Sequence, residues 1–171
     1  FDGYYRIVYN SIIHDTNGDF PSDRLDRFNI KFKDWRKNGN KIVMVPPSIP
    51  MGKFVGVPHE EWIDFTKQEL EKHTDREIIL CQKQKGKKSN LMELLKDAWV
   101  LITDHSNCQV DALVNGVPVI STSPMRKIGS LADVENPVMD RSFLKNLAYR
   151  QWTINEINSG QAWRELNDFP Q

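Results

Sequence analysis

The chain has 171 residues, of which 39% are hydrophobic and 27% charged, the balance of an ordinary globular protein. Lysine plus arginine and aspartate plus glutamate each number 23, so the formal net charge is zero. This balance argues against a nucleic-acid-binding protein, which usually carries a basic excess. No run of about 18 apolar residues predicts a transmembrane helix, and no signal peptide is visible. Because the two cysteines, Cys81 and Cys108, are far apart in sequence, we expect a reduced, cytoplasmic protein.

The first 40 residues carry weak patterns, and we interpret 1–40 as an N-terminal extension or the remnant of a preceding domain. Residues 4–13 alternate loosely and favour a strand. A cluster of turn formers follows at 15–22. Next, 22–28 favours one helical turn and 29–35 an extended segment.

From Lys41 onward, short apolar strands alternate with helices. Runs of β-branched and apolar residues predict strands at 41–45, 77–81, 100–103 and 117–121. Helices are expected at 58–72, 91–98 and 108–115, a loop at 48–56, and two terminal helices at 140–151 and 153–166, the second starting with a capping box. This order predicts an α/β domain over 41–171: a three-layer Rossmann-like parallel sheet with helices on both faces, plus two C-terminal helices.

A polar turn, Asp104-His105-Ser106-Asn107, joins the third strand to a short helix. Free backbone N–H groups and the helix dipole at such a start favour an anion, usually phosphate. Ser106 and Asn107 either cap the helix or hold a diphosphate, and the two roles are compatible. Gly116 is expected to take the left-handed position that ends the helix.

In open parallel sheets the ligand lies beyond the carboxyl ends of the strands, which adds further candidates. Asp111 is either an exposed helix acid or an acceptor for a ribose diol. His105 is either structural or a group that contacts phosphate or transfers a proton. The basic run at 83–88 is either a solvated loop or a phosphate-facing one. The remaining candidates are Ser48, Lys83, Lys85, Ser121 and Ser123 for donor binding, and His14 as a base.

Several common enzyme signatures are missing from the sequence. There is no G-x-S-x-G elbow, no Walker A pattern and no G-x-G-x-x-G, which argues against serine hydrolases of that type, kinases, GTPases and dinucleotide dehydrogenases. Neither a CxxC pair nor ligand spacing for a metal occurs, so no metal and no bound cofactor are expected.

The segment His105-Ser-Asn-Cys-Gln-Val-Asp-Ala-Leu-Val-Asn-Gly-Val-Pro-Val-Ile120 resembles the C-terminal nucleotide-sugar motif of GT-B glycosyltransferases. The spacing from Asp111 to Gly116 and Pro118 fits that motif. Many of those families have Gly-Gly and Glu where this chain has Ser106-Asn107 and Asp111.

Nearly the whole chain is also similar to a group of short bacterial and phage proteins labelled glycosyltransferase-like. The matching pieces include Tyr4-Tyr-Arg6, Val45-Pro-Pro-Ser48, Thr103-Asp-His-Ser-Asn107 and the stretch 151–164. This resemblance implies a bacterial cell or a phage-infected host.

The resemblance implies metal-independent transfer of a sugar from a nucleotide sugar to an unknown hydroxyl acceptor. A GT-B enzyme needs two Rossmann-like halves, and this chain is long enough for one, so the base is expected in residues 1–40, in a missing N-terminal domain or in a partner subunit of a homo-oligomer. The alternatives are a nucleotide-sugar epimerase and a non-catalytic, structural or virion-associated binding module derived from a transferase half.

Overall fold

The computed structural model describes residues 3–7, 19–82, 89–123 and 128–168. The chain divides by compactness into two units, one formed by 1–30 with 140–171 and the other by 31–139. We refer to 31–139 as the α/β unit and to the other as the terminal unit.

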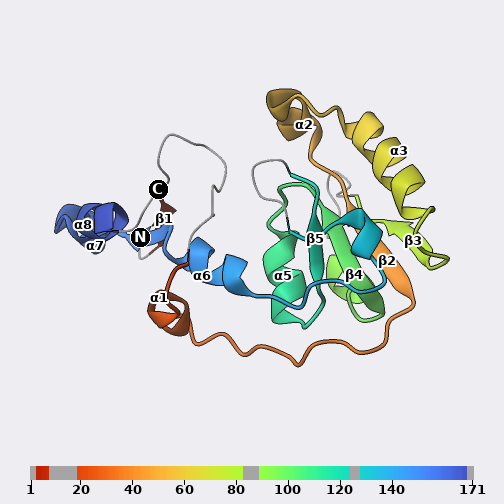
Figure 1. Cartoon of the computed structure of the whole chain (residues 1–171). Helices are drawn as coiled ribbons and strands as arrows, with labels where there is room; N and C mark the ends of the chain where they lie inside the picture. The colour runs from red at the N-terminus through yellow and green to blue at the C-terminus, as the bar shows by residue number, and fades with distance from the viewer. Residues whose placement is uncertain (1–2, 8–18, 83–88, 124–127, 169–171) are drawn as a thin grey trace. The chain divides into compact units, whose positions relative to one another are not determined.

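The α/β unit contains a four-stranded parallel sheet flanked by helices, as the alternation of strands and helices predicts (Figure 1). The strand order is β3 (Glu77–Leu80), β2 (Lys41–Val45), β4 (Ala98–Thr103) and β5 (Val119–Ser121), with Lys41 opposite Glu77 and Leu101 opposite Val119. In chain order the elements are β2 (Lys41–Val45), α2 (Ile49–Val55), α3 (His59–Leu70), β3 (Glu77–Leu80), α4 (Leu91–Leu94), β4 (Ala98–Thr103), α5 (Cys108–Val114), β5 (Val119–Ser121) and the 3₁₀ helix η1 (Leu131–Asp133).

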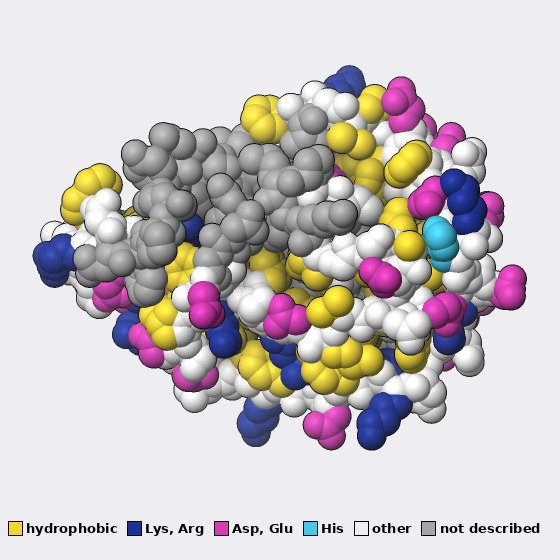
Figure 2. All heavy atoms as spheres, viewed as in Figure 1, with side chains coloured by type: hydrophobic (Ala, Val, Ile, Leu, Met, Phe, Trp, Pro, Cys, Tyr) yellow, Lys and Arg dark blue, Asp and Glu magenta, His cyan; other side chains and the backbone are white. Residues whose placement is uncertain are grey.

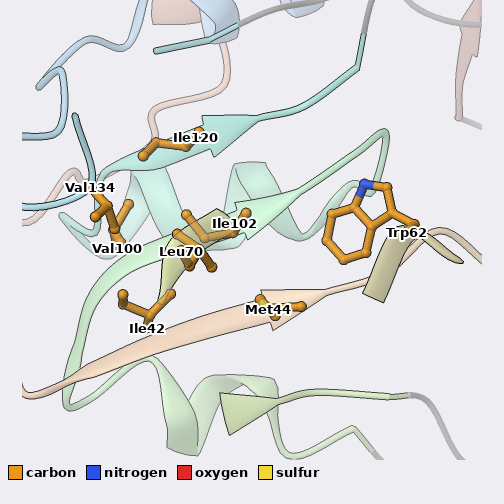
Figure 3. Close-up of a cluster of buried hydrophobic side chains, with 8 residues drawn as sticks. All are labelled: Ile42, Met44, Trp62, Leu70, Val100, Ile102, Ile120 and Val134. Carbon is orange, nitrogen blue, oxygen red and sulfur yellow. The ribbon is translucent and has the colours of Figure 1, made fainter. Parts of the chain in front are cut away.

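A cluster of buried hydrophobic side chains joins the sheet to α3 and to the residue after η1 (Figure 3). Met44 and Ile102 come from the two central strands, and Trp62 and Leu70 come from α3. All of these side chains are at most 4% exposed. Burial of apolar surface at about 25 cal/mol per Å² is therefore the main force that holds α3 on the sheet.

Two predictions in the α/β unit need correction. The expected loop at 48–56 contains helix α2, because Ser48 caps it, Pro50 sits in its first turn, and Gly56 ends it with a φ of 74°. The helix expected at 91–98 is shorter than predicted: α4 ends at Leu94, and strand β4 begins at Ala98.

Gly116 ends α5 with a φ of 74°, which confirms the left-handed position expected from the sequence. The segment before β2 packs closely here: the Lys33 N–H donates to the Val114 carbonyl at 3.0 Å and the Arg36 N–H to the Gly116 carbonyl at 2.8 Å. A Cβ atom on Gly116 would collide with the Asp34 carbonyl oxygen. The position therefore needs glycine for both its backbone conformation and its space.

The terminal unit is built on the antiparallel pair β1 (Tyr4–Arg6) and β6 (Gln151–Thr153), in which Tyr5 is opposite Trp152. Its helices are α1 (Asp23–Asp26), α6 (Ser142–Ala148), α7 (Ile154–Asn158) and α8 (Gln161–Asp168). Of the strand expected at 4–13, residues 4–6 are confirmed, and those from 8 onward lie outside the described residues.

The two expected C-terminal helices also need correction. The first is the shorter α6, since 151–153 form β6. The second is divided into α7 and α8 at Gly160, which has a φ of 74°. The capping box between Thr153 and Glu156 is present as predicted.

Charged groups are mixed over the visible surface. On the face drawn in Figure 2, acidic and basic side chains alternate and do not gather into a patch of one sign. None of the helices in the described part of the chain has the length and apolarity that a membrane crossing needs.

Candidate functional site

The carboxyl ends of the four parallel strands lie at one edge of the sheet, where ligands bind in open α/β folds. A cavity of about 510 Å³ opens at the ends of β2, β3 and β4. Its polar lining is supplied by Ser48, His59, Gln82, His105 and Ser106, with the buried Cys81 between them. We call this the first cavity, and its size is that of a small-molecule site.

Two serine hydroxyls of the first cavity retain a hydrogen that they can donate. Ser48 Oγ accepts the Met51 N–H at 3.4 Å, and Ser106 Oγ accepts the Cys108 N–H at 3.3 Å. A hydroxyl that accepts a backbone hydrogen bond still carries its own O–H donor. Both residues were candidates from sequence, and the fold brings them to the same cavity from different strand ends.

His59, which the sequence patterns did not single out, links three segments at this cavity. Its Nδ1–H donates to the Pro47 carbonyl at 2.6 Å, and its Nε2 accepts a hydrogen bond from the Gln82 side-chain amide at 3.1 Å. Neither partner is near His59 in sequence, so only the position of a histidine at a predicted helix start could have suggested it.

At the start of α5, where an anion site is expected, three backbone N–H groups have acceptors within the turn. The Cys108 N–H is bound to Ser106 Oγ, the Gln109 N–H donates to the Ser106 carbonyl at 3.3 Å, and the Val110 N–H donates to the Asn107 carbonyl at 2.9 Å. Asn107 makes no side-chain cap hydrogen bond. An anion at this turn would therefore compete with these three contacts or bind through other groups of the turn, such as its side chains.

His105 lies between two polar side chains and is nearly closed off from solvent. Its Nδ1 lies against Asp104 Oδ2 in a close contact that is not a hydrogen bond, and the two side chains are 6% and 2% exposed. Its Nε2 lies 3.0 Å from Ser123 Oγ. The Asp104 carbonyl is held in turn by the Ser121 hydroxyl, which donates to it at 2.9 Å.

A second cavity of about 390 Å³ lies at the end of β5. Ser121 and Ser123 line it, together with Phe65 and Glu69 of α3 and Ser130 before η1. His105 in the wall of the first cavity and Ser123 in the wall of the second are joined by their hydrogen bond. The candidate serines from the sequence are thus divided between two neighbouring cavities.

The other candidates stand apart from these cavities. Asn107 and Asp111 line neither of them, and partial burial raises the pKa of Asp111. Lys83, Lys85 and His14 lie outside the described residues.

Both cysteines are buried, and burial raises the pKa of each thiol, that of Cys108 to about 11. The Cys81 thiol donates a hydrogen bond to Asn90 Oδ1 at 3.6 Å. Within the described ranges, no three His, Cys, Asp or Glu side chains gather as metal ligands. Comparisons with protein-family models, curated proteins and solved structures give no match.

Proposed function

We propose that the chain is the donor-binding half of a glycosyltransferase of GT-B type, which binds a nucleotide sugar and transfers the sugar to a hydroxyl acceptor without a metal. The three-layer Rossmann-like arrangement and a cytoplasmic location in a bacterium or a phage-infected host cell are parts of the same proposal. A missing N-terminal domain or a second copy of the chain would complete the cleft.

One observation carries the proposal: a cavity of about 510 Å³ lies at the carboxyl edge of a parallel sheet and is lined by Ser48 and Ser106. Both hydroxyls can donate to an anion, as can the Gln82 side-chain amide beside them. Such a set of neutral donors suits phosphate oxygens, whose charge rises as the bond from phosphate to sugar breaks.

The reaction needs two further contributions. In the proposal Lys83 and Lys85 supply positive charge to the departing phosphate, and Asp111 accepts hydrogen bonds from the ribose hydroxyls. Asp111 lines neither described cavity, so its role is tested apart from that of the cavity residues. Asp111→Asn tests it separately.

The test is calorimetric titration of the chain with UDP, GDP and CMP and with UDP-glucose, GDP-mannose and a CMP-sugar. We expect one nucleotide family to bind with a dissociation constant between about 1 μM and 1 mM, the usual range for enzyme substrates. Absence of binding by every nucleotide, with the fold verified by circular dichroism, would overturn the proposal.

Product analysis then separates the alternatives. An epimerase would convert the sugar of UDP-GlcNAc with no acceptor present, whereas a transferase releases the nucleotide. A protein that binds a nucleotide sugar but neither converts nor transfers the sugar would be a binding module.

A further inference from the structure

His59 is held at the first cavity by two hydrogen bonds of different kinds. It is the first residue of α3, and its side chain is 16% exposed. Its Nδ1 lies 2.6 Å from the Pro47 carbonyl oxygen, which only accepts hydrogen bonds, so Nδ1 carries a hydrogen in every charge state of the ring. The charge of His59 therefore depends on Nε2, whose partner is the side-chain amide of Gln82 at 3.1 Å.

The Gln82 amide is a suitable partner for Nε2 whether or not this nitrogen carries a proton. Beside a neutral ring, the amide donates one N–H to Nε2. Beside an imidazolium, the amide rotates by half a turn, and its oxygen accepts the hydrogen of Nε2. Gln82 is exposed, so packing does not block this rotation. The rotation also releases the N–H that was bound to Nε2, and this N–H becomes available to an anion.

The charged and titratable groups around His59 act on its charge in opposite directions. Glu60 and Glu61, in the same helical turn, favour the imidazolium; Glu60 Oε1 lies 4.0 Å from Nε2, but its side chain is 83% exposed and the attraction is weak. The positive end of the α3 dipole opposes the imidazolium. The residues of α2 that line the cavity are uncharged. Burial raises the pKa of the Cys81 thiol, so this thiol in the lining is also uncharged at neutral pH.

The described lining of the first cavity contains no lysine or arginine. An anion there meets the neutral donors of Ser48, Ser106 and Gln82, and two histidines, His59 and His105. Imidazole is the side chain whose charge changes between about pH 5 and pH 8, and a nearby negative charge favours its protonated form. His105 is more completely closed off from solvent, with 6% of its side chain exposed against 16% for His59. His59 is therefore the better placed of the two to exchange a proton with solvent.

We infer that His59 and Gln82 form a proton-linked anion-binding pair, in which His59 takes up a proton when the diphosphate of a nucleotide sugar enters the first cavity. This inference rests on the proposed function and adds a positive charge to the described lining of that site. The proton comes from solvent, binds Nε2 and stays there while the anion is bound. The Gln82 amide rotates at the same time, so its oxygen accepts from Nε2 and its N–H groups are free to donate to phosphate. Affinity for the diphosphate therefore rises as pH falls.

The first experiment is nitrogen-15 NMR of the histidine rings and glutamine side-chain amides in the ligand-free chain, with His59 assigned by His59→Asn. At about pH 8 we expect a protonated Nδ1 and a bare Nε2. As pH falls, the Gln82 amide signals should move in step with protonation of Nε2, and in His59→Asn they should not move. A His59 ring with a bare Nδ1, or a Gln82 amide that does not respond to the charge of His59, would overturn the pair.

The second experiment measures proton uptake by calorimetric titration with UDP-glucose, GDP-mannose and a CMP-sugar in two buffers of different ionisation enthalpy. The phosphates of these compounds do not titrate near neutral pH, so a proton taken up on binding goes to the protein. We expect uptake of up to about one proton per site, and an affinity that rises about three- to tenfold from about pH 8 to about pH 6. His59→Asn keeps an N–H donor for the Pro47 carbonyl but has no titratable nitrogen, and it should abolish both effects.

Two further histidine variants locate the proton, with the fold of each verified by circular dichroism. His73→Gln is the matched control, because His73 is close to the end of the same helix, contacts Glu69 and does not line the first cavity. It should keep the uptake and the pH dependence of the wild type. Binding without proton uptake, or uptake that His105→Gln removes and His59→Asn keeps, would overturn the inference. Absence of binding by all three nucleotide sugars would instead reject the proposed function, and the NMR result would stand by itself.

Discussion

In the terminal unit, the buried Arg24 is surrounded by protein groups. Its guanidinium donates to Glu156 at 3.0 Å and to the Gln151 carbonyl at 2.7 Å, and it lies 3.7 Å from the centre of the Trp152 ring. In the α/β unit, the His105 side chain is 6% exposed and also lies against a carboxylate, that of Asp104, yet it stands in the wall of a cavity. The contacts of Arg24 join α1 to β6 and α7 and so hold the terminal unit together. His105 keeps its contacts and also borders a cavity, so burial and polar contacts alone do not show whether a side chain serves only the fold.

The largest effect that would sharpen this contrast is expected from Arg24→Ala. Removal of the guanidinium leaves Glu156, whose side chain is 15% exposed, without the shorter of its two ion pairs. Breaking a buried pair in this way costs about 3–5 kcal/mol. Urea denaturation followed by tryptophan fluorescence measures the loss. Arg27→Ala is the control, since Arg27 also reaches Glu156 but is 51% exposed, and it should cost no more than about 1 kcal/mol. Equal effects would contradict the structural role of Arg24.

A second comparison lies within the α/β unit and concerns two glycines with the same φ of 74°. Gly116→Ala adds a collision with the Asp34 carbonyl to the backbone cost of about 1–2 kcal/mol, whereas Gly56→Ala meets no atom within 4 Å. We expect Gly116→Ala to lower the free energy of unfolding by clearly more than Gly56→Ala. Urea denaturation measures both variants. Equal losses of unfolding free energy would show that the segment before β2 does not pack closely on the turn at Gly116.

Nucleotide affinity tests whether the first cavity is open to an anion. Ser48→Asp keeps a residue that caps α2 but places a carboxylate where phosphate is proposed. We expect affinity to fall by about tenfold or more, which corresponds to about 1.4 kcal/mol. Ser48→Asn retains the cap without the charge and is the control. If calorimetry gives the same nucleotide affinity for Ser48→Asp as for the wild type, the phosphate does not bind beside Ser48 in this cavity.

The smallest expected effect is a pH dependence in the terminal unit. Burial raises the pKa of Glu156, but hydrogen bonds from Thr153 and Arg24 outweigh it and hold the pKa below the usual value. A depressed carboxyl pKa adds stability above the unfolded value of about 4.3 and loses it as pH falls through the folded value. Glu156→Gln should therefore flatten the loss of stability between about pH 5 and pH 3 by about 1 kcal/mol. If the free energy of unfolding of Glu156→Gln falls between about pH 5 and pH 3 as it does in the wild type, Glu156 is not the source of this pH dependence.

The sequence predicts the parallel sheet well because its strands are continuous apolar runs, as 41–45 illustrates. It misses α2, since Pro50 and Gly52 are typical of loops when read alone, although Ser48 is a cap signal. It also misses β6, because a three-residue strand depends on pairing with β1 at the other end of the chain. Contacts between residues distant in sequence leave no local pattern, and the partners of His59 and the approach of Ser123 to His105 are of this kind.

The pairing of β1 with β6 also bears on the order in which the protein forms during synthesis. The α/β unit is one continuous stretch, 31–139, whereas the terminal unit combines residues before it with residues after it. Domains generally fold as the ribosome releases them, N-terminal parts first. Strand β1 therefore remains unpaired until Gln151 and the rest of β6 emerge from the ribosome. The sheet and its two cavities can be complete on the ribosome before the terminal unit closes.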